Sequence, residues 1–148
     1  MSRILAIDYG RKRVGLAVTD VLQIIATSLD TVHSKDVIKY INEYVKSEPV
    51  ELFVIGFPKD LQNKDTDATK FVEVFIKQLN KAFPNIPVEK IDERFTSKIA
   101  FRAMIDGGLK KSDRRDKSMI DKVSAVIILQ SYLEQRQNII NRNTVSET

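Results

Sequence analysis

Four acidic residues stand where apolar segments of the chain end or begin, and buried segments usually avoid a carboxylate. Asp8 follows the first apolar run, Asp92 and Glu93 follow a later one, and Asp121 lies in the first turn of the last predicted helix. Ligands of α/β sheets bind beyond the carboxyl ends of the strands, so these side chains could meet in one crevice. Clustered carboxylates repel unless a cation neutralises them, and Mg²⁺ or Mn²⁺ accept ligand sets made only of oxygen. Two such ions about 4 Å apart can hold a phosphodiester for in-line displacement, so the pattern predicts a metal-dependent phosphodiester hydrolase.

Each acid also has an ordinary structural explanation. An Asp that follows a strand is commonly a turn residue that accepts hydrogen bonds from its own backbone. Asp121 would stabilise a helix N-terminus by its charge alone, and Asp92, Glu93 and Arg94 could form a solvated loop. The functional interpretation gains weight because three separate segments carry an acid. It requires that the first and fifth strands can be neighbours and that the last helix packs across them.

Composition removes several other kinds of chemistry. The 148 residues contain no cysteine, which excludes disulfides, thiolate metal sites and a Cys nucleophile and fits a reducing cytoplasm. The single histidine, His33, falls at the end of a predicted strand and is interpreted as a surface residue. The net charge of +4 favours polyanionic partners mildly. The longest apolar runs are too short to span a membrane, so no membrane partner is expected.

Hydrophobic periodicity predicts the elements that would position the acids. Three short strands come first, joined by polar turns as in an antiparallel meander. A helix follows that Ser34 caps and Pro49 stops, and two further strands then alternate with helices. The predicted strands are Ile4–Ile7, Val14–Thr19, Gln23–Val32, Leu52–Pro58 and Val88–Ile91. The predicted later helices are Phe71–Phe83, Thr96–Ile105 and Met119 to about Arg136, the last opened by a Ser118–Asp121 capping box.

This order, β-β-β-α-β-α-β-α-α, predicts the fold class α/β. We expect one five-stranded mixed sheet, with three antiparallel strands and then helix-alternating strands, and with helices on both faces. Residues 1–138 form a single domain in this interpretation. Residues 139–148 have few large apolar side chains after Ile140 and are expected to form a frayed tail.

Four segments together resemble the YqgF-type family. They are AIDYGRKRVGLAVTD, VIGFPKDLQNKDT, DERFTS and DKVSAVIILQSYL, in the order that the family has them, from Ile4 to about Leu133. Members are described as Holliday junction resolvases and as nucleases that process the 5′ end of pre-16S rRNA. The resemblance implies an RNase H-like fold and a metal-dependent nuclease site. One departure is the loop Phe57-Pro58-Lys59, where relatives often carry smaller apolar residues, and it bears on substrate contacts more than on chemistry.

The resemblance also implies roles for the acids. Asp8 matches the acid of the first strand, Glu93 the acid within DER, and Asp121 the acid of the last helix, so these three are the expected catalytic residues. All three, with Asp92 in support, are the expected ligands of Mg²⁺ or Mn²⁺, with two ions expected. Successive strand residues face opposite sides, so only one of Asp92 and Glu93 can face the site unless a bulge intervenes. Glu93 is favoured for its longer reach.

Basic residues near the acids are the candidates for nucleic-acid contact. Arg11, Lys12 and Arg13 lie close to Asp8 in the sequence, and they could meet phosphates or simply solvate a turn that Gly10 makes possible. The other candidates are Arg94, Lys110, Lys111, Arg114 and Arg115. Arg94 could instead pair with Asp92. Tyr9 and Phe57 are the only aromatic residues placed to stack on bases, and either could be part of the core.

The predicted function is a divalent-metal-dependent nuclease for structured nucleic acid, with 5′-end processing of pre-16S rRNA as the favoured reaction. The alternatives are a Holliday junction resolvase and a non-catalytic nucleic-acid-binding module. An actin-like ATPase would need two such domains, and this chain has the length of one. We expect a cytoplasmic protein that acts as a monomer or a weak homodimer.

Overall fold

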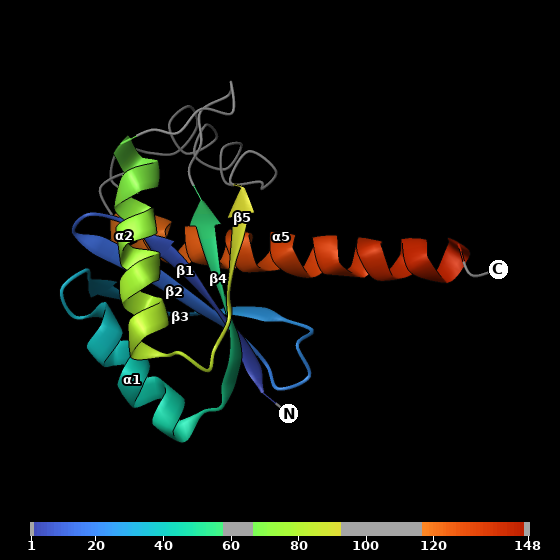
Figure 1. Cartoon of the computed structure of the whole chain (residues 1–148), viewed down its shortest axis with the longest axis horizontal. Coiled ribbons are helices and arrows are strands. Elements are labelled where there is room, and N and C mark those ends of the chain that lie inside the picture. The colour runs from blue at the N-terminus through green and yellow to red at the C-terminus, as the bar shows by residue number, and fades with distance from the viewer. Residues whose placement is uncertain (1, 58–66, 93–116, 147–148) are drawn as a thin grey trace.

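The computed structural model describes residues 2–57, 67–92 and 117–146 (Figure 1). The strands are β1 (Arg3–Tyr9), β2 (Arg13–Thr19), β3 (Ala26–His33), β4 (Val50–Phe57) and β5 (Val88–Asp92). The helices are α1 (Val37–Ser47), α2 (Asp67–Ala82) and α5 (Lys117–Ser146). The helix expected over Thr96–Ile105 lies outside the described residues. Among the described residues, no helix combines the length and the apolar character that crossing a membrane requires.

The five strands form one mixed sheet in the order β3-β2-β1-β4-β5. β1 pairs antiparallel with β2, and β2 with β3, whereas β1–β4 and β4–β5 are parallel. The predicted mixed five-stranded sheet is therefore confirmed. The expectation that β1 and β5 could be neighbours is wrong, because β4 lies between them. β2 already occupies one edge of β1, so the chain returning from α1 adds β4 at the other edge and β5 beyond it.

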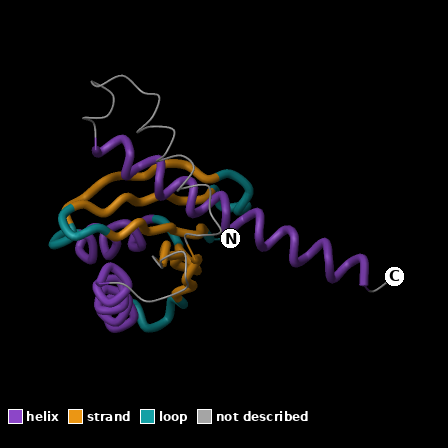
Figure 2. The backbone as a smooth tube through the Cα atoms, turned by 90° about the horizontal axis from the view of Figure 1, so that it is seen from above, coloured by secondary structure: helices purple, strands orange, loops and turns teal. Residues whose placement is uncertain are grey.

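Alternation along β1 explains why its residues are apolar at successive positions. Leu5 and Ile7 pack into a core cluster with residues of α1 and α2. Ile4 and Ala6 point to the opposite face and pack with Ala125, Ile128 and Leu129 of α5. Figure 2 shows α5 along one face of the sheet and the other two helices on the opposite face. A strand covered on both faces needs apolar side chains on both, so the helices predicted on both faces are confirmed.

The sequence predicted that Ser34 caps α1, and this prediction is wrong. The N-cap residue is Asp36, and its side chain makes no capping hydrogen bond within the described part of the chain. Ser34 instead donates from its hydroxyl to the carbonyl oxygen of Arg11 (2.6 Å) and from its backbone N–H to that of Lys12 (3.0 Å). The serine is therefore a tertiary anchor for the turn between β1 and β2.

The last helix is longer than predicted at both ends. α5 begins at Lys117, before Ser118, so the predicted Ser118–Asp121 capping box is wrong. It also continues to Ser146 rather than ending near Arg136. Its final turns extend past the sheet (Figure 1), where Ile139 is 57% exposed. The residues expected to form a frayed tail are thus helical as far as Ser146, although this part of the helix lies beyond the core.

Candidate functional site

Asp8 lies within β1 and not in the turn that follows it. It pairs with Gly15 of β2, and β1 continues to Tyr9. Asp8 is two residues after Ala6 and four after Ile4, and residues two apart in a strand share a face. Its side chain is therefore on the face covered by α5, where Ile4 and Ala6 pack. The residue is only 8% exposed. The explanation of Asp8 as an ordinary turn residue is therefore wrong, and a carboxylate in this place needs another reason.

Glycines flank Asp8 on both neighbouring strands. Gly15 is its partner on β2. Gly56 lies one residue past the Ile7–Ile55 pair of β1 and β4, which places it beside Asp8. It shares a face of β4 with Val54, which packs on the α5 face. Directly paired residues share a face of the sheet, so no side chain stands beside the Asp8 carboxylate on either strand.

Asp92 lies on the opposite face of the sheet from Asp8. It pairs with Phe57, whose ring belongs to the core cluster under α1 and α2, while the preceding Ile91 packs on the α5 face. Asp92 is also two strands away from Asp8, which corresponds to about 10 Å across a sheet. The structure therefore does not bring these two acids together.

Most of the remaining predicted site residues lie outside the described part of the chain. Glu93, Arg94, Lys110, Lys111, Arg114 and Arg115 lie outside the described residues. Asp121 is the fifth residue of α5, beyond its first turn, where the helix dipole has little effect. Asp121 precedes Ala125 of the sheet-covering stripe by four residues, although its side chain is outside the described part. Within the described ranges, no three His, Cys, Asp or Glu residues form a group that could hold a metal, so the four-carboxylate cluster stays a prediction.

Ser124 is a buried polar residue one turn after Asp121. It is fully buried, and its Oγ has no hydrogen-bond partner among the described residues. A buried hydroxyl without a partner is unfavourable, so its position in the interface of α5 with the sheet invites a polar ligand. Its hydroxyl and the buried Asp8 carboxylate both offer oxygen as a ligand atom. That set fits a hard divalent cation such as Mg²⁺ or Mn²⁺.

A rigid basic turn lies at the same end of β1 as Asp8. The Gly10 N–H donates to the Arg13 carbonyl oxygen (3.1 Å), and a Cβ on Gly10 would lie only 2.6 Å from that oxygen. Arg11, Lys12 and Arg13, which we call the basic turn, are all exposed. Ser34 holds two of its carbonyls, and the Arg11 guanidinium lies 5.6 Å above the ring of Phe71. The backbone of the turn is thus held in place while its cationic side chains reach solvent.

The two aromatic residues proposed to stack on bases belong to the core. Tyr9 stacks on Phe75, with ring centroids 4.0 Å apart and an interplanar angle of 9°, and burial raises the pKa of its hydroxyl. Phe57 is 6% exposed, and the Lys90 ammonium lies 4.6 Å from its ring centroid. Both rings lie on the α1 and α2 face, opposite to Asp8. Ser34, which the sequence suggested only as a cap, is the residue whose role was missed, because its contact spans 23 positions and no local pattern reports it.

The sheet order and helix placement define the class of protein. T. thermophilus RuvC in complex with a Holliday junction aligns with 93% of this chain and 96% of its own, with a TM-score of 0.56 and 17% sequence identity. At this identity the match defines the fold, which is RNase H-like, as predicted.

The chain belongs to the RuvX family, described as Holliday junction resolvase, whose model matches residues 2–135. A protein of Phocaeicola vulgatus is 55% identical over 94% of this chain and 100% of its own length. A protein of Parabacteroides distasonis is 53% identical over 93% of this chain and 98% of its own. Each carries the name "Putative pre-16S rRNA nuclease". The family predicted from the four motifs is confirmed.

Proposed function

We propose that this chain is a divalent-metal-dependent nuclease that processes the 5′ end of pre-16S rRNA. The observation that carries the proposal is the buried Asp8 carboxylate, which lies between two glycines on the α5 face at the carboxyl end of β1. The nuclease class predicted from the sequence agrees with the description of the family and with the names of its curated relatives. Such a reaction would place the protein in the cytoplasm, as the absence of cysteine led us to expect.

We infer that Asp8, Glu93 and Asp121 would hold the metal, with Asp92 outside the set. Asp92 faces α1 and α2, and adjacent residues of a strand face opposite sides. This parity supports the neighbouring acid Glu93 as the partner of Asp8. Asp121 is supported by its four-residue spacing from Ala125, because residues four apart share one side of a helix. Two bound Mg²⁺ or Mn²⁺ ions would supply Lewis acidity to the attacking and the leaving oxygen of the phosphodiester.

The chain's own side chains would perform the remaining tasks. Asp8 would fix the metal position, because its strand is hydrogen-bonded on both edges and its side chain is enclosed by α5. The basic turn would contact phosphates of the substrate backbone, and such contacts position a nucleic acid without reading its sequence. Ser124 would contribute its buried hydroxyl as a hydrogen-bond partner to a ligand that enters this interface.

Resolution of a four-way DNA junction is the second candidate. The description of the family and the fold shared with a junction-binding RuvC favour it. Cutting two strands of a junction would call for a two-fold dimer, whereas a monomer is sufficient to trim the single strand of an rRNA leader.

The test is cleavage by the full chain of a labelled pre-16S rRNA 5′ leader and, in parallel, of a four-way DNA junction. Each reaction is run with Mg²⁺, with Mn²⁺ and with a chelator. We expect metal-dependent cleavage of the leader, and a loss of about a thousandfold or more in kcat for Asp8→Asn, as when a central catalytic group is removed. Asp20→Asn, which changes an acid at the opposite end of β2, is the matched control and should cleave normally.

Three outcomes would contradict the proposal. Full cleavage by a folded Asp8→Asn variant would exclude the role of that residue. Cleavage of the junction alone would replace the substrate. RNA binding without any metal-stimulated cleavage would favour a non-catalytic nucleic-acid-binding module.

A further inference from the structure

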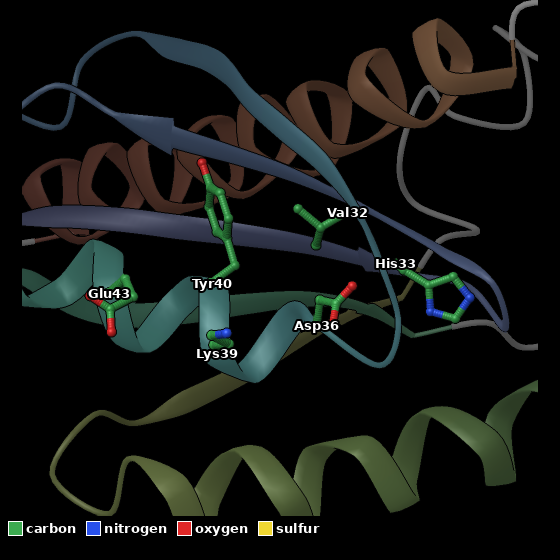
Figure 3. Close-up of a pocket in the computed structure, with 6 residues that line it drawn as sticks. All are labelled: Val32, His33, Asp36, Lys39, Tyr40 and Glu43. Carbon is green, nitrogen blue, oxygen red and sulfur yellow. The ribbon is translucent and has the colours of Figure 1, made fainter.

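A pocket lies between the end of β3 and α1, on the far side of the basic turn from Asp8. Its volume is about 450 Å³, which is within the range of small-molecule sites. The residues that line this β3–α1 pocket are Val32, His33, Asp36, Lys39, Tyr40 and Glu43 (Figure 3). Family resemblance assigned no role to any of them.

Two rings of fixed orientation are placed at the two ends of the β3–α1 pocket, with Val32 between them (Figure 3). The Lys35 backbone N–H donates to Nδ1 of His33 (3.0 Å), which orients the imidazole and leaves Nε2 available to a ligand. The Tyr40 side chain is hydrogen-bonded to Asp30, and burial, followed by that carboxylate, raises the pKa of its hydroxyl. Unpaired bases are commonly bound by stacking on Tyr and His rings. His33 is exposed and is therefore a better stacking candidate than Phe57, which is in the core. Tyr40 is partly buried against the core cluster, as Tyr9 is.

The polar groups of the pocket match the edges of a nucleoside. Asp36 makes no capping hydrogen bond in the described part of the chain, and Glu43 is exposed, 3.3 Å from Lys46. These carboxylates can accept hydrogen bonds from the amino group of a base or from a ribose 2′-hydroxyl. Lys39 adds a cation that can donate to a base carbonyl or a phosphate. A contact with backbone phosphates alone would need only cations. The combination of hydrogen-bond acceptors, a donor and rings therefore favours a nucleoside as the ligand of this pocket.

The β3–α1 pocket is also joined directly to the basic turn. Arg13 pairs with His33 in the register of β2 and β3, and Ser34, the next residue, bonds to the turn carbonyls. His33 lies two strands from β1 and two residues further along than Asp8, a separation of about 12 Å in sheet geometry. Val32 and Tyr40 pack on the α1 and α2 face of the sheet, opposite to Asp8. A strand whose phosphate is at Asp8 would therefore pass around the basic turn at the end of the sheet to place a nearby nucleoside in the pocket.

We propose that the β3–α1 pocket binds one unpaired nucleoside of the substrate strand while the basic turn holds its neighbouring phosphates. This inference rests on the proposed function for its substrate class, and its test is independent of cleavage. The nucleoside enters between His33 and Tyr40, and Asp36, Lys39 and Glu43 provide its hydrogen bonds.

The test is fluorescence anisotropy of the full chain with short labelled oligonucleotides in the presence of a chelator, so that no cleavage occurs. The probes are a single-stranded RNA, a single-stranded DNA of the same sequence and a fully paired RNA duplex. We expect His33→Ala to weaken single-strand binding about tenfold, because a stacked base contributes on that scale, and to leave duplex binding unchanged. Lys39→Ala should weaken single-strand binding in the same way, whereas Lys77→Ala, which changes another exposed lysine, on α2, should not.

Unchanged single-strand affinity in both His33→Ala and Lys39→Ala would overturn the proposal. An equal loss on the duplex would also overturn it, because the contact would then be to the backbone alone. A larger loss with RNA than with DNA would show that the pocket also recognises the ribose 2′-hydroxyl, and an equal loss would show that it recognises the base. If Asp8→Asn cleaves normally while His33→Ala still binds weakly, the proposed function fails and the pocket assignment stands.

Discussion

An aspartate lies near each end of β2, and the two have different structural roles. Asp8 lies in the adjoining strand at one end, is buried, and has glycine neighbours. Asp20 follows β2 at the other end and accepts backbone N–H bonds from Leu22 (3.2 Å), Ile24 (2.8 Å) and Ile25 (2.8 Å). Asp20 therefore builds its own turn, whereas Asp8 lies inside a strand that continues to Tyr9. An acid after an apolar strand is structural when its turn supplies the donors and a functional candidate when the strand continues past it.

The surroundings of the two ends differ in the same way. At the β2–β3 turn, Gln23 has a left-handed φ of 58° and donates from its side chain to Ser2 (2.9 Å). Arg136 of α5 donates to both the side chain and the backbone of Gln23 (2.8 and 3.3 Å). At the β1–β2 turn, Ser34 holds the backbone and the cations reach solvent. The β2–β3 turn is held by contacts with Ser2 and with α5, whereas the β1–β2 turn is held in a shape that presents charge.

The largest expected difference between the two ends is in the response to metal. Mn²⁺ at a hundredfold excess over its Kd should stabilise the wild-type chain by about 2.7 kcal/mol, as mass action requires for a ligand of the folded state. Asp8→Asn should lose this stabilisation and Asp20→Asn should keep it. Thermal unfolding with and without Mn²⁺ measures the effect. A wild-type response in Asp8→Asn would remove the distinction between the two acids.

Gly10→Ala should have the next largest effect. The new Cβ would lie 2.6 Å from the Arg13 carbonyl oxygen, and both atoms belong to the backbone framework, so no side-chain rotation relieves the contact. We expect the free energy of unfolding to fall by about 1–3 kcal/mol, measured by urea denaturation. Lys12→Ala, in the same turn and exposed, is the control and should change stability by less than about 0.5 kcal/mol. Equal stability of Gly10→Ala and wild type would show that the turn can relax.

Asp20→Asn should reveal a pH-dependent contribution at the other end. The N–H groups of Ile25 and Ile24 hold the pKa of Asp20 below its ordinary value. A lowered folded-state pKa contributes stability above the unfolded pKa of about 3.9, and this stability is lost as the pH falls through the folded value. The variant should therefore melt a few degrees below wild type at pH 7, and the difference should vanish in stronger acid. A difference in Tm that stays constant with pH would point to the geometry of the turn rather than to charge.

The smallest effect should come from Ser34→Ala. It removes the 2.6 Å hydrogen bond to Arg11 but keeps the backbone bond to Lys12, so stability should fall by about 1 kcal/mol or less. If Ser34 positions the basic turn, KM for RNA should rise several-fold while kcat is unchanged. Ser47→Ala, which removes a local hydroxyl bond at the end of α1, is the matched control. A fall in kcat with constant KM would contradict a positioning role.

The fold could be predicted where the pattern of apolar side chains indicates whether one or both faces of a strand are covered by helices. Residues 4–7 are apolar at every position, which indicates a strand enclosed on both sides, and Ile4 and Leu5 indeed face different helices. The sequence could not show that β4 separates β1 from β5, because strand adjacency depends on which sheet edge is open when a strand returns. The length of α5 was underestimated because its polar final turns lack the apolar spacing that marks a buried helix.

The candidate site was predictable in its residue types but not in its geometry. Strand alternation already implied that only one of Asp92 and Glu93 could face the site. The choice against Asp92 depended on knowing which faces of the sheet Phe57 and Ile91 occupy. The same limit applied to Tyr9 and Phe57, whose rings could have faced solvent or core. Ser34 was misjudged for a different reason, because its contact with the β1–β2 turn joins segments 23 positions apart in the sequence.

The position of α5 after all five strands in chain order has a consequence for biosynthesis. β1, β2 and β3 pair with their neighbours in sequence, and such local contacts form early. Among the described residues, α5 covers the face that carries Asp8, and it leaves the ribosome after every strand of the sheet. A nascent chain can therefore build most of its sheet before α5 packs on this face. The Asp8 carboxylate becomes enclosed by α5 only after that helix has been synthesised, so a shorter nascent chain has the scaffold of the site without this cover.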